Sequence, residues 1–225
     1  MSLQILITSD NSHTLYNDIL NETYHSVNGA MDESMHVYIN NGFNESIKNR
    51  SSVSVFEMGF GTGLNAVLTF IEAEKNNIHC TYHTIETFPL DTGLISQLNY
   101  KSTIENKFHF AFDMLHDSKW NEEMQISENF RFMKIHGSFE NYDPLSTYDL
   151  AYFDAFAPDK QPELWTEEIF RKLFNHMNDD GILVTYSAKG EVRRNLQRAG
   201  FTVERLEGPK GKREMMRCRK QQQII

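Results

Sequence analysis

One short segment, 57–65, combines residues that could bind a nucleoside-bearing ligand: Glu57-Met-Gly-Phe-Gly-Thr-Gly-Leu-Asn65. It closes an apolar run at 53–58 that is typical of a buried β-strand, and it leads into a stretch whose apolar residues repeat at helical spacing over 64–71. Glycine lets the backbone turn sharply and approach a ligand closely, because no Cβ stands in the way. Since a doubly wound sheet binds its ligand where a strand ends and a helix begins, this position predicts a binding site.

The spacing of the glycines narrows the class of ligand. A dinucleotide-binding loop has the pattern G-x-G-x-x-G, whose third glycine would fall at position 64, where this chain has Leu64. No lysine followed by Ser or Thr comes after the last glycine, which excludes a phosphate-binding P-loop. An acid two positions before the first glycine, Glu57, is typical of methyltransferases, where it can accept from the ammonium group of S-adenosylmethionine. A tight turn without a ligand is the alternative interpretation.

A second acidic residue supports the same cofactor. Glu86 ends a predicted strand over 80–86, about 23 residues after Gly63, where a carboxylate can accept both ribose hydroxyls of an adenosyl group. A solvated strand end is the other reading of Glu86. The two features together predict S-adenosylmethionine as the cofactor, with these cofactor-binding residues: Glu57, Gly59, Phe60, Gly61, Thr62, Gly63, Asn65 and Glu86.

The acceptor side is predicted from Asp154-Ala-Phe-Ala-Pro158, which follows an apolar strand over 148–153. The same geometry places Asp154 beside the cofactor, where it could hold an amine or take its proton, and Phe156 could stack on a base. Methyl transfer depends on in-line geometry more than on elaborate acid and base groups, so one catalytic carboxylate is sufficient. The alternative is that Asp154 only caps the next turn.

Strands and helices alternate along the chain in the order that a parallel sheet requires. We expect strands over 53–58, 80–86, 130–135, 148–153 and 181–187, helices over 64–71, 90–98, 163–177 and 191–199, and a hairpin of 202–206 with 214–218. This predicts an α/β, Rossmann-like fold of the class I methyltransferase type: a mostly parallel sheet, helices on both faces and a C-terminal antiparallel hairpin.

Residues 1–50 do not follow this alternation. Strand-like runs at 4–8 and 37–40 bracket a polar segment with a candidate helix near 25–35, and residues 101–129 show no readable period. We therefore expect an N-terminal extension or lid over 1–50 and a methyltransferase domain over 51–225.

Composition sets further bounds. The net charge is −9, but residues 189–220 hold eleven Lys and Arg against four Glu, a balance of +7 that leaves −16 on the rest of the chain. This basic region predicts either a face that binds a polyanion or an ordinary solvated surface. Two cysteines, no metal-binding spacing among nine histidines, no apolar run long enough to span a bilayer and no secretory signal favour a cytoplasmic protein without metal or membrane partners.

Longer runs carry a resemblance to a known family. The 57–65 segment, Asp154-Ala-Phe-Ala-Pro-Asp-Lys-Gln-Pro-Glu-Leu-Trp165 and Lys212-Arg-Glu-Met215 resemble, in this order, the methyltransferase half of the bifunctional bacterial tRNA wobble-uridine enzymes of the MnmC family. The Ser187-Ala188 pair before Val192-Arg193-Arg194 and the run 196–201 are similar too, and 29–38 looks like the lid segment of that family.

The resemblance implies methylation of the exocyclic amine of 5-aminomethyl-2-thiouridine at the tRNA wobble position. It places Asp154 and Phe156 near the methyl group and the amine, and it directs five basic residues toward RNA: Lys160, Arg193, Arg194, Lys212 and Arg213. Ser138 stands where an acid commonly contacts the adenine, so Ser138 or nearby backbone would take that role. Because the sequence ends soon after these motifs, we expect the methylation step alone, with a separate enzyme supplying the aminomethyl precursor.

Three other functions stay open at this point. A methyltransferase of the same fold could act on a small-molecule or protein amine, which suits the overall acidity. A non-catalytic protein could keep the cofactor fold, as the missing acid at position 138 would allow. A dinucleotide-dependent oxidoreductase is disfavoured by Leu64.

Overall fold

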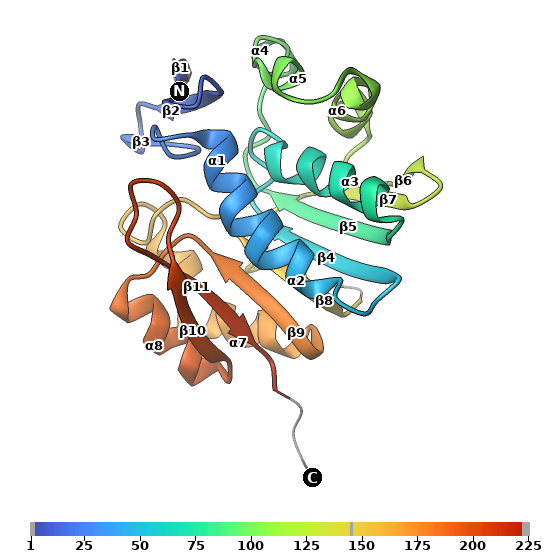
Figure 1. Ribbon diagram of the computed structural model, residues 1–225. Helices are drawn as coiled ribbons and strands as arrows, with labels where there is room; N and C mark the ends of the chain where they lie inside the picture. The colour runs from blue at the N-terminus through green and yellow to red at the C-terminus, as the bar shows by residue number, and fades with distance from the viewer. Residues whose placement is uncertain (1–2, 145, 222–225) are drawn as a thin grey trace.

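Within residues 3–144 and 146–221, the part of the chain that the computed structural model describes, eight strands form a central sheet (Figure 1). The strands are β4 Ser52–Met58, β5 His79–Glu86, β6 Glu123–Ser127, β7 Phe130–His136, β8 Tyr148–Phe153, β9 Met177–Thr185, β10 Thr202–Glu207 and β11 Glu214–Arg219. Their order is β10-β11-β9-β8-β4-β5-β7-β6. The five neighbours from β9 to β7 run parallel, whereas β6, β10 and β11 are antiparallel to their neighbours. The predicted parallel sheet and closing hairpin are confirmed.

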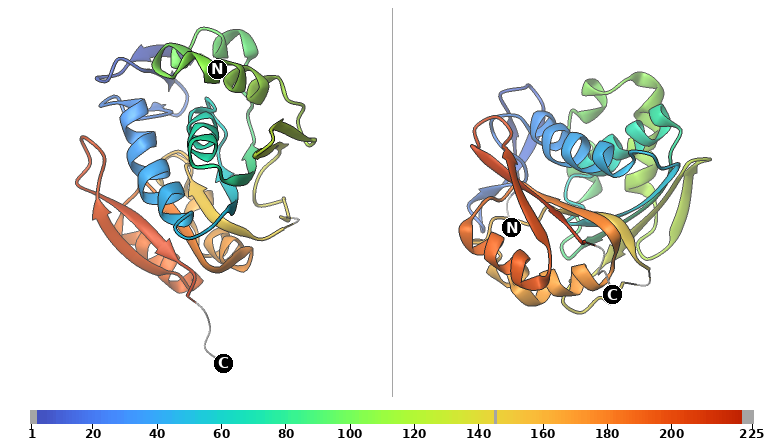
Figure 2. Two further views of the ribbon diagram at one scale, coloured as in Figure 1. Left: turned by 45° about the vertical axis from the view of Figure 1, so that its right-hand side comes forward. Right: turned by 60° about the horizontal axis from the view of Figure 1, so that its bottom comes forward.

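Helices cover both faces of this sheet (Figure 2). One face carries α3 Leu64–Asn76, α6 His109–Asp117 and a continuous helix made of α1 Ala30–Ser34, η1 Met35–Phe43 and α2 Asn44–Ser46; the other carries α7 Glu167–Asn175 and α8 Gly190–Ala199. Shorter turns are α4 Thr92–Ile95, α5 Tyr100–Thr103, η2 Asn106–Phe108 and η3 Pro162–Trp165.

Alternation along the central strands decides which side chains reach the site. On β4, Val53 and Val55 belong to the apolar cluster under α3, while Phe56 and Met58 belong to the cluster under α7 and α8. Successive strand residues point to opposite faces. Glu57 therefore points to the face that α3 covers. The residues of β8 alternate in the same way, so Asp154, directly after β8, points to that face too.

The prediction of a strand at 37–40 is wrong. These residues lie in η1, where Val37, Tyr38 and Ile39 are all buried, and Gly42 lies close enough for an added Cβ to contact Val184 and Tyr152 of the sheet. The consecutive apolar residues resemble a buried strand in sequence, but here they are the inner surface of a helix that packs on the sheet. The expected helix near 25–35 begins only at Ala30 and continues to Ser46.

The rest of the N-terminal segment forms a small separate sheet. Strands β1 Leu3–Ile7, β2 His13–Asn17 and β3 Glu22–Thr23 pair antiparallel in sequence order. The predicted strand over 4–8 is thus confirmed as β1. The ends of both predicted domains, at residues 1–2 and 222–225, and residue 145 lie outside the described part of the chain.

Two predicted helices are shorter than expected. The stretch 90–98 is helical only over α4, and 163–177 divides into η3 and α7, because Met177 already begins β9. The unreadable stretch 101–129 contains α5, η2, α6 and β6, whose antiparallel pairing with β7 extends the sheet. Polar surface residues conceal the period of these short elements.

No helix in the described residues has both the length and the apolar character of a membrane span. The same residues contain no group of three or more His, Cys, Asp or Glu side chains placed to hold a metal ion. Cys80 and Cys218 are both buried and free.

Candidate active site

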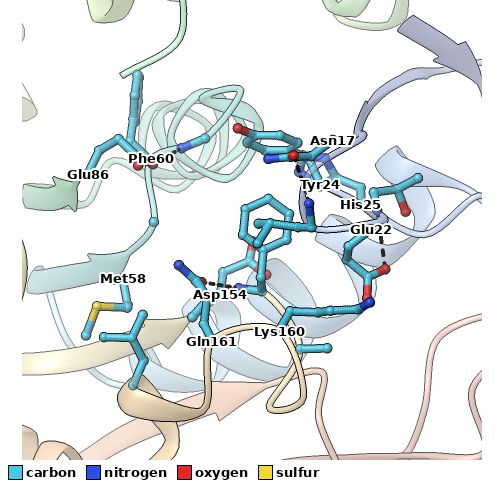
Figure 3. A pocket seen from close by; sticks show the side chains of 18 of the residues that line it. Asn17, Glu22, Tyr24, His25, Met58, Phe60, Glu86, Asp154, Lys160 and Gln161 are labelled. Carbon is cyan, nitrogen blue, oxygen red and sulfur yellow. Dashed lines mark hydrogen bonds between the residues drawn. The ribbon is translucent and has the colours of Figure 1, made fainter. Parts of the chain in front are cut away.

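Three segments meet at the carboxyl edge of the parallel sheet: the glycine loop after β4, the tip of β5 and the loop after β8. They line one side of a cavity of about 690 Å³ whose other side comes from the N-terminal segment. Figure 3 shows side chains of all these segments facing the cavity, among them Glu86, Asp154 and Tyr24. Cavities of this size are typical of small-molecule sites.

The glycine loop approaches two neighbours too closely for side chains. Gly59 and Gly61 have φ of 91° and 48°, in the left-handed region that favours glycine. A Cβ on Gly59 would lie 3.0 Å from the carbonyl oxygen of Asp154, and one on Gly61 would lie 3.2 Å from Cδ1 of Tyr24. Glycine therefore brings the loop against both the acceptor loop and the N-terminal segment.

Glu86 is fixed across the mouth of this loop. Its Oε2 accepts from the backbone N–H of Gly61 at 3.0 Å, and its Oε1 accepts from the N–H of Phe88 at 2.8 Å. The carboxylate lines the cavity, at the strand tip where the sequence predicts a ribose contact. The tip of β5 thus presents an acceptor group that is already oriented by backbone donors.

Glu57 lies behind the loop rather than on the cavity wall. Its side chain is completely buried, and neither carboxyl oxygen makes a hydrogen bond of normal geometry within the described residues. Burial and, to a smaller extent, the charge of Asp154 together raise the pKa of Glu57 to about 8, although polar groups of Thr84, Asn65 and Tyr82 nearby favour the ionised form. A buried carboxyl of this kind is a candidate for accepting from a bound cation.

Asp154 is held by two side chains from different helices. Oδ1 accepts from the Tyr38 hydroxyl at 2.5 Å, and Oδ2 accepts from Nδ2 of Asn65 at 2.8 Å. Burial and the Glu33 charge raise the pKa of Asp154, while the bonds from Tyr38 and Asn65 and the charge of Lys212 lower it, and the net result is a pKa of about 7. A carboxyl with a pKa near neutrality and a fixed orientation can exchange a proton with a ligand.

Aromatic side chains form the wall beside Asp154. The rings of Tyr24 and Phe156 meet edge to face with centroids 4.9 Å apart. The Phe156 backbone is fixed by a bond from its N–H to Gln161 and by another from the Trp165 indole to its carbonyl, at 2.9 Å and 2.8 Å. Burial and the Glu86 charge raise the pKa of Tyr24, so its hydroxyl stays neutral. This wall offers a planar apolar surface next to a proton acceptor.

Comparison with known proteins agrees with this geometry. Residues 101–221 match the model of a family described as S-adenosyl-L-methionine-dependent methyltransferase. The chain belongs to this family.

Relatives of the methyltransferase carry a common name. This chain is 30% identical over 230 residues to the tRNA 5-methylaminomethyl-2-thiouridine biosynthesis bifunctional protein MnmC of Leptospira borgpetersenii serovar Hardjo-bovis (strain JB197). The aligned region covers 94% of this chain and 34% of that protein. The protein of the same name from Burkholderia multivorans is 26% identical over 216 residues, with 90% of this chain and 33% of that one covered. The chain thus spans about a third of the length of these relatives.

Solved structures share the fold of the methyltransferase. MNMC2 from Aquifex aeolicus matches with a TM-score of 0.82 at 23% identity, over 96% of this chain and 70% of that chain. Spermidine synthase from Thermotoga maritima matches with a TM-score of 0.61 at 12% identity, over 97% of this chain and 69% of that chain. At these identities the likeness concerns the fold, and it confirms the predicted class I architecture.

The predicted site residues of the methyltransferase divide into two sets. Those that line the cavity are Gly59, Phe60, Gly61, Thr62, Asn65, Glu86, Asp154, Phe156, Lys160 and Lys212. Glu57 and Gly63 lie behind the wall, and the cavity lining among the described residues does not include Ser138, Arg193, Arg194 or Arg213. The roles of both sets stay predictions.

Four further residues of the methyltransferase site have no counterpart among the residues predicted from sequence. Tyr24 and Glu33 line the cavity from the N-terminal segment, Tyr186 lines it from the end of β9, and Tyr38 holds Asp154. Tyr38 and Asp154 are 116 positions apart, so no local spacing connects them. The only available signal was the resemblance of 29–38 to a lid segment, which did not single out Glu33 or Tyr38.

Proposed function

We propose that this methyltransferase transfers a methyl group from S-adenosylmethionine to the exocyclic amine of 5-aminomethyl-(2-thio)uridine at the wobble position of tRNA. The observation that carries the proposal is the Asp154 carboxyl, oriented by Tyr38 and Asn65 and placed on the same cavity as the glycine loop. The name shared by the relatives, which refers to 5-methylaminomethyl-2-thiouridine biosynthesis in tRNA, supports this acceptor.

The residues present suit the cofactor. Five acidic side chains line the cavity against two lysines: Glu22, Glu33, Glu86, Asp154 and Glu163 oppose Lys160 and Lys212. This negative balance favours a cationic ligand. When bound, S-adenosylmethionine supplies an electrophilic methyl group on a sulfonium. Glu86 would accept the ribose hydroxyls, Glu57 would face the ammonium through the loop, and Ser138 or backbone nearby would contact the adenine.

Asp154 and its neighbours prepare the amine. An alkyl amine arrives largely protonated at neutral pH and must lose a proton before its lone pair can attack carbon. With a pKa of about 7, Asp154 keeps an ionised fraction that can accept this proton, while Tyr38 and Asn65 fix the carboxylate in one orientation. The freed lone pair could then attack the methyl carbon that a bound S-adenosylmethionine would supply, with the sulfonium sulfur as the leaving group. Phe156, with Tyr24 against its edge, would hold the base by stacking.

The RNA would approach over four basic residues that the resemblance to the MnmC family directs toward it. Lys160 lines the cavity, Arg194 and Arg213 are exposed, and Arg193 is half-buried. We assign these four side chains to phosphate contacts, and we assign the N-terminal segment before α1 to a lid over the cofactor. The reaction is placed in the cytoplasm, where a separate enzyme activity would supply the aminomethyl group.

Nucleoside mass spectrometry tests the acceptor. Purified protein and S-adenosylmethionine are incubated with tRNA that carries 5-aminomethyl-2-thiouridine, and with the same tRNA already carrying the methylated product as the matched control. The proposal predicts a gain of one methyl group on the first tRNA only. If the tRNA stays unchanged while a simple alkyl diamine becomes methylated, the alternative of a small-molecule acceptor replaces it.

A further inference from the structure

The loop between β10 and β11 lies beside the N-terminal segment (Figure 1). Lys212 of this loop contacts Glu33 of that segment, and both residues line the cavity. Lys212 Nζ in this loop lies 2.6 Å from Oε1 of Glu33, whose side chain is only 7% exposed. The other oxygen of Glu33 accepts from the backbone N–H of Ser26 at 2.7 Å. One ion pair therefore connects the C-terminal hairpin to α1 and to the turn that precedes it.

Two more contacts make the same connection. A Cβ on Gly211, which has φ of +86°, would overlap the side chain of Asn28, so the hairpin loop touches residue 28 directly. His36 shares a hydrogen bond of 2.8 Å between its Nε2 and the carbonyl oxygen of Glu207. The hairpin loop and the N-terminal segment thus pack as one unit, although they are distant in sequence.

Lys212 also reaches the acceptor side of the cavity. Its Nζ lies 3.9 Å above the centre of the Tyr186 ring, and the Tyr186 hydroxyl donates to the carbonyl oxygen of Ala155 at 2.9 Å. Lys212 lines the cavity together with Asp154, whereas its loop neighbour Lys210 is exposed.

The charged and titratable groups that act on Asp154 come from several elements. They are Glu33 from α1, Tyr38 from η1, Glu57 from β4, Tyr186 after β9 and Lys212 from the hairpin loop. Lys212 is the one cation among these groups in the described residues, and it is already paired with Glu33. Its removal would therefore leave Asp154 facing only acids, phenols and the Asn65 amide.

We propose that Lys212 is a positioning residue of this site: through its ion pair with Glu33 it holds the segment 24–33 over the cavity and balances the negative charge beside Asp154. This role replaces a direct contact of Lys212 with RNA, while Lys210 and Arg213 of the same loop remain free to face a polyanion. The inference rests on the proposed function only in giving Asp154 its role, because the fastening and the charge balance exist without substrate.

The fastening is tested by hydrogen exchange on the full chain. Lys212→Met removes the charge and keeps an unbranched side chain, and Lys210→Met is the matched control in the same loop. We expect amides of 24–29, including the Ser26 N–H, to exchange several-fold faster in Lys212→Met and at the wild-type rate in Lys210→Met. Equal exchange in all three proteins would overturn the fastening.

The charge balance is tested by titrating Asp154 directly. Protein labelled with ¹³C at the aspartate carboxyl is followed by NMR, and the Asp154 signal is assigned by its loss in Asp154→Asn. The midpoint should rise by about 0.5 pH unit or more in Lys212→Met, fall in Glu33→Gln, and lie between these two in the double variant. Lys210→Met should leave the midpoint unchanged.

The outcomes separate this inference from the proposed function. An Asp154 midpoint that does not move in Lys212→Met overturns the charge balance even if the wild-type protein methylates tRNA. Conversely, the predicted shifts would support it even if no tRNA were methylated. If Lys212→Met does not fold, Glu33→Gln still tests the charge balance. The Asp154 midpoint must fall in that variant, whatever the result for Lys212→Met.

Discussion

The buried Glu57 leads to a stability prediction that can be worked out from the structure. We expect Glu57→Gln to stabilise the protein at alkaline pH. The side chain is 0% exposed, and burial is the largest cause that raises its pKa from an ordinary 4.5 to about 8. Between these two values the folded protein keeps a proton that the unfolded chain has lost. The contribution of Glu57 to the free energy of unfolding therefore falls as pH rises through this window, and the full penalty is present above about pH 8.

The interval between pKa 4.5 and about 8 sets the size of the effect. It corresponds to at most about 5 kcal/mol, because one pKa unit equals about 1.4 kcal/mol. Reorientation of Thr84, Asn65 and Tyr82 around the charge will reduce it, so we expect a measured gain of about 1–3 kcal/mol at pH 9. At pH 5 the glutamine and the protonated acid are both neutral, and the difference between the two proteins there provides the baseline.

Urea unfolding followed by circular dichroism measures this difference at pH 5, 7 and 9. Glu128→Gln, at an exposed position, is the matched control and should show no growth of the difference with pH. If the stability difference between Glu57→Gln and wild type were the same at pH 5 and pH 9, the folded protein would not be burying an ionisable Glu57 as described. Glu57→Gln should also bind S-adenosylmethionine more weakly than wild type, and calorimetry measures this difference.

Three further predictions concern the site itself. Glu86→Ala should weaken binding of both S-adenosylmethionine and S-adenosylhomocysteine by about 1–3 kcal/mol in calorimetry, since both ligands carry the ribose; unchanged affinity would remove Glu86 from the cofactor site. Because the pKa of Asp154 is raised to about 7, kcat/KM for methyl transfer should fall as pH decreases through about 7, whereas a flat profile between pH 5.5 and 8 would argue against a proton-accepting Asp154. Tyr38→Phe removes a hydrogen bond that lowers the pKa of Asp154, so the acidic limb of that profile should move to higher pH, and an unmoved limb would limit Tyr38 to a packing role.

Local patterns in the sequence were sufficient to place the glycine loop and Glu86 together at one edge of the sheet. The glycine loop, the strand before it and the acid at the end of the next strand all lie within residues 53–86, and their order along the chain fixes their order at the sheet edge. Alternation on each strand then places Glu57, Glu86 and Asp154 on the same face of the sheet. These relations follow from the geometry of parallel strands and need no tertiary information.

The acceptor side depends on contacts that sequence spacing does not contain. The helix over 30–46 was misread in part as a strand because Val37, Tyr38 and Ile39 are consecutive apolar residues, and its packing brings Tyr38 to Asp154. Charge counting had a similar limit. Lys212 is paired with Glu33, while Arg217 and Arg219 are paired with Glu45, so part of the basic region predicted from composition is neutralised by acids of the N-terminal segment.

The most direct test of the central claim is a single-turnover assay of methyl transfer to tRNA carrying the aminomethyl group, with isotopically labelled S-adenosylmethionine and the Asp154→Asn variant beside wild type. Both proteins should bind the cofactor in calorimetry, and the wild type alone should move the label onto the wobble nucleoside at neutral pH. An Asp154→Asn variant that transfers the label as fast as wild type would contradict the assignment of this cavity as the methyl-transfer site.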